Sequence, residues 1–225
     1  MKTGSDLSSP DVADRASSTA ETLLTSRGKS TRERILQCAA QVLAEKGYAG
    51  STLADIADRA KTKAGSLYYY FDSREEMIRE IMTRGITETQ SHVSRAVEEL
   101  GPEATSRDKL AGAITAQVRY LLTENDIARA SIRTLGQAPA EVQGPAIELH
   151  RVYSAYLANL IETAQSDGYI AANADIRLVR LLVAGAANWS TAWYNPQGRA
   201  AVDEIAETLV QMTLGELSGP NTVHR

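Results

Sequence analysis

The segment Ser51 to Phe71 constrains the fold of this chain more than any other part of the sequence. It reads STLADIADRAKTKAGSLYYYF, in which two short helical patterns flank a polar, lysine-rich break. The second pattern ends in four consecutive aromatic residues, although the whole chain holds only 2 Trp, 9 Tyr and 1 Phe. A compact helix pair whose second helix exposes small residues, hydroxyl groups and a cation has the shape that enters the major groove of DNA. The segment therefore predicts a helix-turn-helix over residues 51–70.

Helical patterns also dominate the rest of the sequence. The chain has 225 residues and shows no stretch in which apolar and polar residues alternate convincingly with period two. Beyond the break at Gly101-Pro102, helical spacing recurs in five segments: 107–123, 126–136, 140–166, 175–194 and 202–216. We therefore predict an all-α protein of about nine helices, in which a three-helix, helix-turn-helix DNA-binding domain precedes a C-terminal helical domain.

Composition divides the chain into four segments. Residues 1–26 are rich in Ser, Thr and Asp and contain few large apolar side chains, which predicts a disordered arm, with a short helix over 12–24 as the alternative. Residues 27–84 form the predicted DNA-binding domain and residues 85–218 the second helical domain. Residues 219–225 are predicted to be a flexible tail.

Charge is distributed unevenly between the two predicted domains. Residues 27–84 hold 11 Lys and Arg against 8 Asp and Glu, whereas residues 85–225 hold 11 against 16. A basic module joined to an acidic remainder indicates that only the N-terminal part of the molecule meets phosphate groups.

The sequence lacks the features that several other classes of protein require. No run of about 18 apolar residues suggests a membrane span, and the N-terminus has no apolar signal core, so we expect a cytoplasmic protein. Cys38 is the only cysteine, which excludes an intrachain disulfide. No metal-ligand spacing, phosphate-binding glycine loop or catalytic constellation is visible. We therefore expect no metal, no cofactor and no enzyme activity.

The third predicted helix, Lys63–Tyr70, presents two different faces on a helical wheel. Leu67 and Phe71 lie on the inner side, with Ala64 beside them, whereas a glycine, a serine and two tyrosines fall on the outer side. Gly65 costs about 1 kcal/mol of helix stability relative to Ala. DNA approaching the backbone at that point would explain why a glycine stands there.

Seven residues on or beside this helix are candidates for DNA contact. Hydroxyl groups and lysine can reach phosphates and base edges, while Thr52 and Arg74 would anchor phosphates on either side of the groove. The aromatic run could instead be ordinary core, but burying Tyr68 and Tyr69 would demand a hydrogen-bond partner for each hydroxyl. The candidates are Thr52, Lys63, Gly65, Ser66, Tyr68, Tyr69 and Arg74.

Residues 31–84 resemble the DNA-binding domain of the TetR family of bacterial repressors. The resemblance rests on the opening TRERILQCAAQVLAEKGY, on STLADIA, and on the closing GSLYYYFDSREEM. The turn departs from the family pattern because it reads Lys61-Thr62-Lys63 where the family usually has Gly-Val-Ser. Ala54 and Ala64 also stand where many members carry longer side chains. Base contacts are therefore expected to shift to Lys63 and the tyrosines.

In that family the C-terminal helices form an effector pocket and a dimer interface, so the resemblance implies both roles for residues 85–218. Residues 188–198, NWSTAWYNPQG, are similar to a subgroup of regulators of fatty-acid and steroid catabolism that respond to acyl-CoA thioesters. The effector-binding residues proposed by this analogy are Arg119, Arg129, Arg133, Tyr153, Trp189 and Trp193. The proposed dimer-interface residues are Ala184, Ala187, Ile205, Leu209 and Met212.

Other interpretations of these residues stay open. Two tryptophans at i and i+4, Trp189 and Trp193, suit ordinary core as well as a pocket wall. Each arginine suits an exposed ion pair with Asp126 or Glu124 as well as a phosphate contact.

The leading hypothesis is a homodimeric repressor that binds double-stranded DNA at a palindromic operator and is released by a small hydrophobic effector such as an acyl-CoA thioester. The first alternative is a helical acyl-CoA or lipophilic-ligand binding protein, or an enzyme, with a vestigial DNA domain. The second is an architectural DNA-binding protein without an effector, which would lack a cavity of about 300 Å³ or more.

Overall fold

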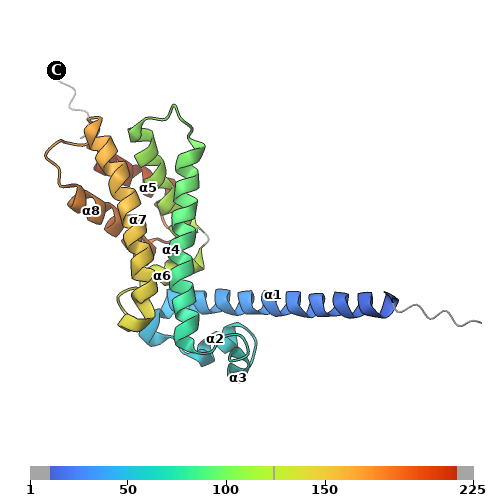
Figure 1. Cartoon of the computed structure of the whole chain (residues 1–225). Coiled ribbons are helices and arrows are strands. Elements are labelled where there is room, and N and C mark those ends of the chain that lie inside the picture. Colours follow the sequence, from blue (N-terminus) through green and yellow to red (C-terminus); the bar gives the residue numbers. More distant parts are fainter. Residues whose placement is uncertain (1–10, 124, 217–225) are drawn as a thin grey trace, which may run out of the picture.

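The computed structural model describes residues 11–123 and 125–216, and over these ranges every regular element is a helix (Figure 1). The prediction of an all-α fold with about nine helices is confirmed. The helices are α1 (Asp11–Gly50), α2 (Leu53–Arg59), α3 (Ala64–Leu67), α4 (Arg74–Glu99), α5 (Ser106–Thr123), α6 (Asp126–Thr134), α7 (Ala140–Ser166), α8 (Ile176–Trp193) and α9 (Val202–Leu214).

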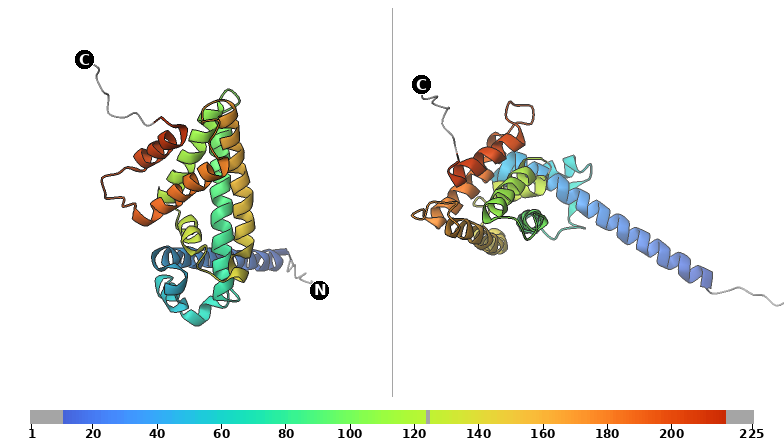
Figure 2. Two further views of the ribbon diagram at one scale, coloured as in Figure 1. Left: turned by 90° about the vertical axis from the view of Figure 1, so that its left-hand side faces the viewer. Right: turned by 90° about the horizontal axis from the view of Figure 1, so that it is seen from above.

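Helix α1 differs from the predicted arm over residues 1–26, because it begins at Asp11 and projects away from the rest of the molecule (Figure 2). No Gly or Pro lies between residues 11 and 26, so a helix nucleated in the packed part can propagate towards the N-terminus. Residues 1–10 and the predicted tail over 219–225 lie outside the described residues. At the other end, Gly47 has a φ of 71° and breaks the regular helix, as a glycine at the end of a helical pattern commonly does.

The DNA-binding domain packs around one apolar core. The C-terminal part of α1, the inner sides of α2 and α3, and the first turns of α4 all contribute to it, and α6 adds side chains from the second domain. The largest fully buried side chains of this core are Ile35, Leu36, Leu43, Ile56, Leu67, Met77, Ile78, Ile81 and Met82. Because residues of both domains share the core, the helix-turn-helix rests directly on the C-terminal domain.

The C-terminal domain contains two further apolar clusters. Helices α4 and α7 run side by side along its length (Figure 1), and with α5 they enclose a cluster that includes Val93, Tyr153 and Leu157. Helices α5, α7, α8 and α9 surround a second cluster around Leu110, Ile114 and Val183. Helices α8 and α9 therefore form the outermost layer, and only their inner sides are covered.

Helix α6 packs closely against α4 at Gly85, with only the small side chain of Ser131 between the two backbones. A Cβ atom placed on Gly85 would lie 2.5 Å from the Cβ atom of Ser131 and 2.9 Å from the carbonyl oxygen of Ile127. The Ser131 hydroxyl also donates a 2.9 Å hydrogen bond to the carbonyl oxygen of Met82. The two helix backbones therefore approach as closely as glycine permits, which fixes α6 against the helix that spans both domains.

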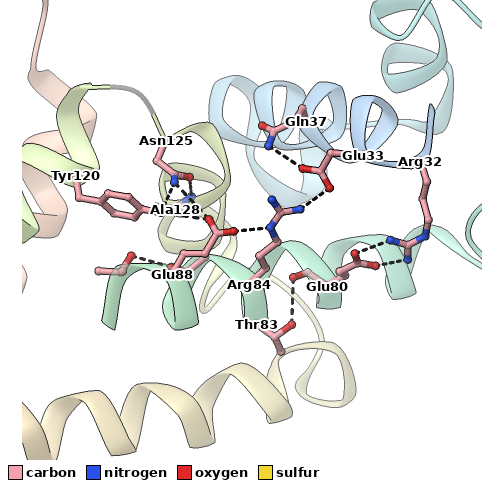
Figure 3. A network of polar contacts seen from close by, with 12 residues as sticks. Arg32, Glu33, Gln37, Glu80, Thr83, Arg84, Glu88, Tyr120, Asn125 and Ala128 are labelled. Carbon is pink, nitrogen blue, oxygen red and sulfur yellow. Dashed lines mark hydrogen bonds and ion pairs between the residues drawn. The ribbon is translucent and has the colours of Figure 1, made fainter. Parts of the chain in front are cut away.

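A polar network joins the two domains on another side of α4 (Figure 3). The Arg84 guanidinium lies 2.7 Å from Glu33 on α1 and 2.6 Å from Glu88 on α4. Glu88 in turn accepts hydrogen bonds from Tyr120 on α5 and from Asn125, which caps α6. Burial and the negative charge of Glu88 raise the pKa of Tyr120 to about 12. The network thus links the first helix of the DNA-binding domain to the α5–α6 corner.

Candidate functional site

The start of α2 is closed by a capping box, a pattern that the spacing of Thr52 and Asp55 in the sequence resembles. The Thr52 hydroxyl accepts a 3.1 Å hydrogen bond from the backbone N–H of Asp55, and the Asp55 carboxylate accepts one of 3.0 Å from the N–H of Thr52. The ammonium group of Lys46 and the Thr52 hydroxyl lower the pKa of Asp55 to about 2. Thr52 itself is exposed, so its backbone stands at the open N-terminal end of the helix.

Helix α3 covers only Ala64–Leu67 and is shorter than the predicted Lys63–Tyr70, because the chain continues from Tyr68 as a turn. Lys61 in the preceding turn has a φ of 51°, in the left-handed region that favours glycine. This is the position at which the family pattern usually has glycine. The lysine therefore accepts a backbone conformation that a glycine would adopt without steric cost.

The predicted division between inner and outer residues of α3 is confirmed for the aromatic run. Leu67 and Phe71 are buried, whereas Tyr68 is 57% and Tyr69 is 87% exposed. A Cβ atom on Gly65 would meet no atom within 4 Å. Ala64, which was expected beside the inner face, is exposed instead. Glycine, hydroxyl groups and Lys63 thus share an open surface, although their contact with DNA stays a prediction.

Arg74 differs from the predicted phosphate anchor because its guanidinium turns inward. Its Nη2 atom donates hydrogen bonds of 3.1 and 3.0 Å to the carbonyl and hydroxyl oxygens of Ser51, and another to the carbonyl oxygen of Tyr48. The guanidinium also stacks 4.5 Å from the centre of the Tyr48 ring. Arg74 therefore ties the start of α4 to the end of α1 and to the loop that follows it, a partner that no sequence pattern indicated.

A cavity of about 830 Å³ lies where the DNA-binding domain meets α6 and α8. Its walls combine amides and apolar carbons with charged groups of both signs. Three of the predicted effector residues line it, namely Arg129, Arg133 and Trp189. The other lining residues are Gln41, Ala44, Glu45, Arg59, Asp126, Ile132, Leu135, Gln137, Gly185, Asn188, Thr191 and Ala192. We call this cavity the interdomain cleft.

Two ion pairs lie in the walls of the interdomain cleft, one on each side. Arg59 on α2 forms a bidentate pair with Glu45 on α1, with nitrogen–oxygen distances of 2.5 and 2.7 Å. These hydrogen bonds lower the pKa of the Glu45 carboxyl. On α6, Arg129 pairs with Asp126 as the sequence had allowed, and its buried Nε atom has no hydrogen-bond partner among the described residues. Arg133 pairs with no carboxylate in the part of the chain that the structure describes.

The other predicted effector residues lie away from this cleft. Arg119 pairs with Asp203 on α9 at 2.7 Å. Tyr153 is buried between α4, α5 and α7, where it donates a 2.9 Å hydrogen bond to Gln117 and burial raises its pKa. Trp193 lines a smaller pocket of about 300 Å³ between α8 and α9. These three side chains therefore do not join Arg129, Arg133 and Trp189 in one site.

The contribution of the DNA-binding domain to the cleft could not be predicted from the sequence. Gln41, Glu45 and Arg59 occupy outer positions of α1 and α2, where polar residues are usual on any amphipathic helix. These side chains face one cavity only because α6 packs against α1. Helical periodicity alone does not contain that information.

Helices α8 and α9 expose a band of large apolar side chains. Leu182 is 73%, Trp189 69%, Trp193 51% and Met212 60% exposed, so the interpretation of the tryptophans as ordinary core is wrong. Of the predicted dimer-interface residues, Ala187 and Leu209 are buried within the protomer. Ala184 and Ile205 are half-buried, and Met212 is exposed. The open band is completed by Leu178 and Leu181.

Among the described residues, no helix combines the length and apolar character needed to cross a membrane. Within the same ranges, His, Cys, Asp and Glu form no group of three that could hold a metal ion.

Two family models match the chain over most of its length. Residues 35–81 match the model described as "Bacterial regulatory proteins, tetR family", and residues 103–217 match "Tetracyclin repressor-like, C-terminal domain". The second match alone spans more than half of the 225 residues.

Curated relatives agree with these matches. The HTH-type transcriptional repressor KstR2 of Rhodococcus jostii strain RHA1 is 28% identical over 196 residues, which cover 86% of this chain and 95% of the relative. The fatty acid metabolism regulator protein of Bacillus subtilis strain 168 is 26% identical over 152 residues, covering 68% and 77% of the two chains.

A solved structure has the same fold. AibR in complex with isovaleryl coenzyme A and operator DNA superimposes with a TM-score of 0.73 and 20% identity, covering 81% of this chain and 97% of AibR. At that identity the likeness extends to the fold alone. The family models, the relatives and the exposed helix-turn-helix lead to one conclusion: this chain belongs to the tetR family of bacterial regulatory proteins and is a DNA-binding transcriptional regulator.

Proposed function

We propose that the protein is a dimeric repressor that binds a palindromic operator and leaves it when an acyl-CoA thioester binds. The observation that carries this proposal is the position of the interdomain cleft. Its walls come from the helix-turn-helix and from the C-terminal domain, so a ligand that fills the cleft contacts both domains.

The DNA-facing surface consists of the open side of α3 and the N-terminal end of α2. The hydroxyl groups of Tyr68 and Tyr69 can donate to phosphates, and Lys63 stands at the start of α3 without a capping role for its side chain. Gly65 leaves room for close approach of the sugar–phosphate backbone. Thr52 and Ser66 complete the proposed surface, whereas Arg74 is excluded because it bonds within the protein.

A second copy of the chain covers the apolar band on α8 and α9. Exposed apolar bands of this kind are costly in water, and a twofold axis lets the same band on two protomers cover each other. The symmetry matches a palindromic operator, because two recognition helices must enter successive major grooves about 34 Å apart. Leu178, Leu182 and Met212 are the proposed centre of the interface, and Trp189 stands at its edge beside the cleft.

The effector class is inferred from the chemistry of the cleft together with the relatives. A volume of about 830 Å³ suits a ligand larger than a simple metabolite. Arg129 and Arg133 offer guanidinium groups for phosphates, and the exposed Trp189 ring offers a stacking surface for a base. AibR was crystallised with isovaleryl coenzyme A, and one relative is a fatty acid metabolism regulator.

Gel-shift titration against the region upstream of the protein's own gene tests the proposal. The parent protein is expected to shift the fragment and to release it when isovaleryl coenzyme A is added. Lys63→Ala and Tyr69→Ala should each weaken binding of the fragment, because each removes a phosphate or base contact. Unchanged binding by both variants would refute the proposed DNA surface. Hydrolysis of the thioester by the parent protein would identify an enzyme instead.

The effector switches the protein only if it favours one state. It must bind the released conformation more tightly than the operator-bound one, since equal affinity for both shifts nothing. The operator-bound protein should therefore bind isovaleryl coenzyme A more weakly than the free protein, by the same factor that the effector weakens operator binding.

A further inference from the structure

We propose that Arg59, on the second helix of the helix-turn-helix, binds the phosphate-bearing end of the effector and leaves Glu45 to do so. This inference rests on the proposed function and adds a direct contact between the effector and the DNA-binding domain. Effector binding then exchanges one partner of Arg59 for another.

The walls of the interdomain cleft place Arg59 among the effector-binding candidates. Arg129 and Arg133 on α6 line the same cavity as Arg59 on α2. Trp189 on α8 lines it as well. A ligand that stacks on Trp189 and reaches the α6 arginines therefore fills a space that α2 also borders.

The charges in the cleft favour an anion. Three guanidinium groups stand against two carboxylates, those of Glu45 and Asp126. With Arg59 paired to Glu45 and Arg129 to Asp126, the guanidinium of Arg133 is the third positive charge among the residues that line this space. Guanidinium groups bind phosphate in a bidentate manner, which makes a phosphate-bearing ligand the matching class.

The pair between Arg59 and Glu45 is suited to exchange. Its side chains are 33% and 54% exposed, and ion pairs with this much solvent access contribute little net stability. A phosphate that also contacts Arg129 and Arg133 carries more charge than a single carboxylate. The phosphate should therefore bind the Arg59 guanidinium more strongly than the Glu45 carboxylate does.

The position of Arg59 in the fold gives the exchange a consequence for DNA binding. Arg59 is the last residue of α2 and directly precedes the turn that leads into α3. A phosphate that takes Arg59 from Glu45 removes the bidentate contact between the end of α2 and α1. The loss of this contact acts on the helix pair that carries the DNA-facing surface, in addition to any change in the spacing of the two protomers.

Isothermal titration calorimetry of the full-length protein with free coenzyme A tests the inference. Arg59→Gln removes a charged hydrogen-bond donor and should weaken coenzyme A binding by about tenfold. Glu45→Gln removes the competing carboxylate and should tighten binding by about two- to fivefold. Arg151→Gln, on an exposed part of α7, is the matched control and should bind like the parent.

The two substitutions are expected to change coenzyme A affinity in opposite directions, which distinguishes a ligand contact from a purely structural role. If the ion pair only supported the fold, both substitutions would break it and both would shift affinity in the same direction. A common direction, or unchanged affinity in both variants, would overturn the inference and leave the proposed function intact, provided that isovaleryl coenzyme A still releases the parent from its operator. A parent protein that binds neither coenzyme A nor isovaleryl coenzyme A would overturn both.

Discussion

The guanidinium of Arg84 on α4 lies 2.7 Å from the carboxylate of Glu33 on α1, at the seam between the two domains. Glu88 binds the same guanidinium from the other side, and Arg32 forms a separate pair with Glu80 one turn earlier on α4 (Figure 3). Both pairs hold α1 against α4 at positions that neither the DNA surface nor the cleft uses. They fix α1 of the DNA-binding domain against α4, the helix that continues into the C-terminal domain.

Arg84→Gln should lower the free energy of unfolding by about 1 kcal/mol, because it leaves Glu33 and Glu88 without their shared cation. Urea denaturation at pH 7 measures this change. Arg151→Gln removes an ion pair on an open helix surface and should leave the midpoint almost unchanged. Equal midpoints for parent and Arg84→Gln would show that the network contributes nothing at the seam.

The same contact predicts a loss of stability in acid. Hydrogen bonds from Arg84 lower the pKa of Glu33 below its ordinary value of 4.5. The unfolded chain therefore takes up this proton before the folded protein does, so the stabilisation is present above pH 4.5 and is lost as pH falls through the lower folded value. Thermal unfolding from pH 6 to pH 3 should show a smaller acid loss in Arg84→Gln than in the parent.

Gly85→Ala should destabilise the protein by about 1–3 kcal/mol, since an added methyl group overlaps Ser131 and the carbonyl of Ile127. A shifted denaturation midpoint with an unchanged slope would confirm a local packing defect. A variant as stable as the parent would mean that α4 and α6 separate easily.

Gly65→Ala should have the opposite effect on stability. The added methyl group meets no atom within 4 Å, and alanine favours the helix by about 1 kcal/mol over glycine. Thermal stability should rise slightly, while binding to the operator fragment should weaken if DNA approaches that backbone. Gel shifts that match those of the parent would refute a close approach at this residue.

Leu182→Lys should convert the dimer into a monomer, because a charge would enter the apolar band on α8 at its most exposed leucine. Light scattering coupled to size exclusion gives the mass directly. Ile147→Lys, at an exposed apolar position on α7, is the control and should remain dimeric. A monomeric parent, or a dimeric Leu182→Lys, would place the interface elsewhere.

Features with short-range causes could be predicted from the sequence. The Thr52–Asp55 capping box, the end of regular helix at Gly47, and the burial of Leu67 and Phe71 all depend on neighbours within one or two turns. The exposure of Tyr68 and Tyr69 followed from the need to satisfy their hydroxyl groups.

Features that depend on contacts between residues far apart in the chain could not be predicted from the sequence. Arg74 was assigned to DNA because no pattern in the sequence brings it close to its partners, Tyr48 at the end of α1 and Ser51 in the loop that follows. Arg119 was assigned to the effector although Asp203, 84 positions later, holds it on α9. Both side chains are long and cationic and can reach many partners, so their position on a helix face says little about which one they choose.

The strained turn before α3 has a consequence for how the operator is found. Lys61 adopts a φ of 51° and, like Lys63, is exposed. Glycine would relax the backbone at residue 61 but would remove a cation whose attraction to phosphate does not depend on base sequence. A cation of this kind lets a regulator slide along DNA between encounters, so Lys61 would speed the search for the operator without selecting its sequence.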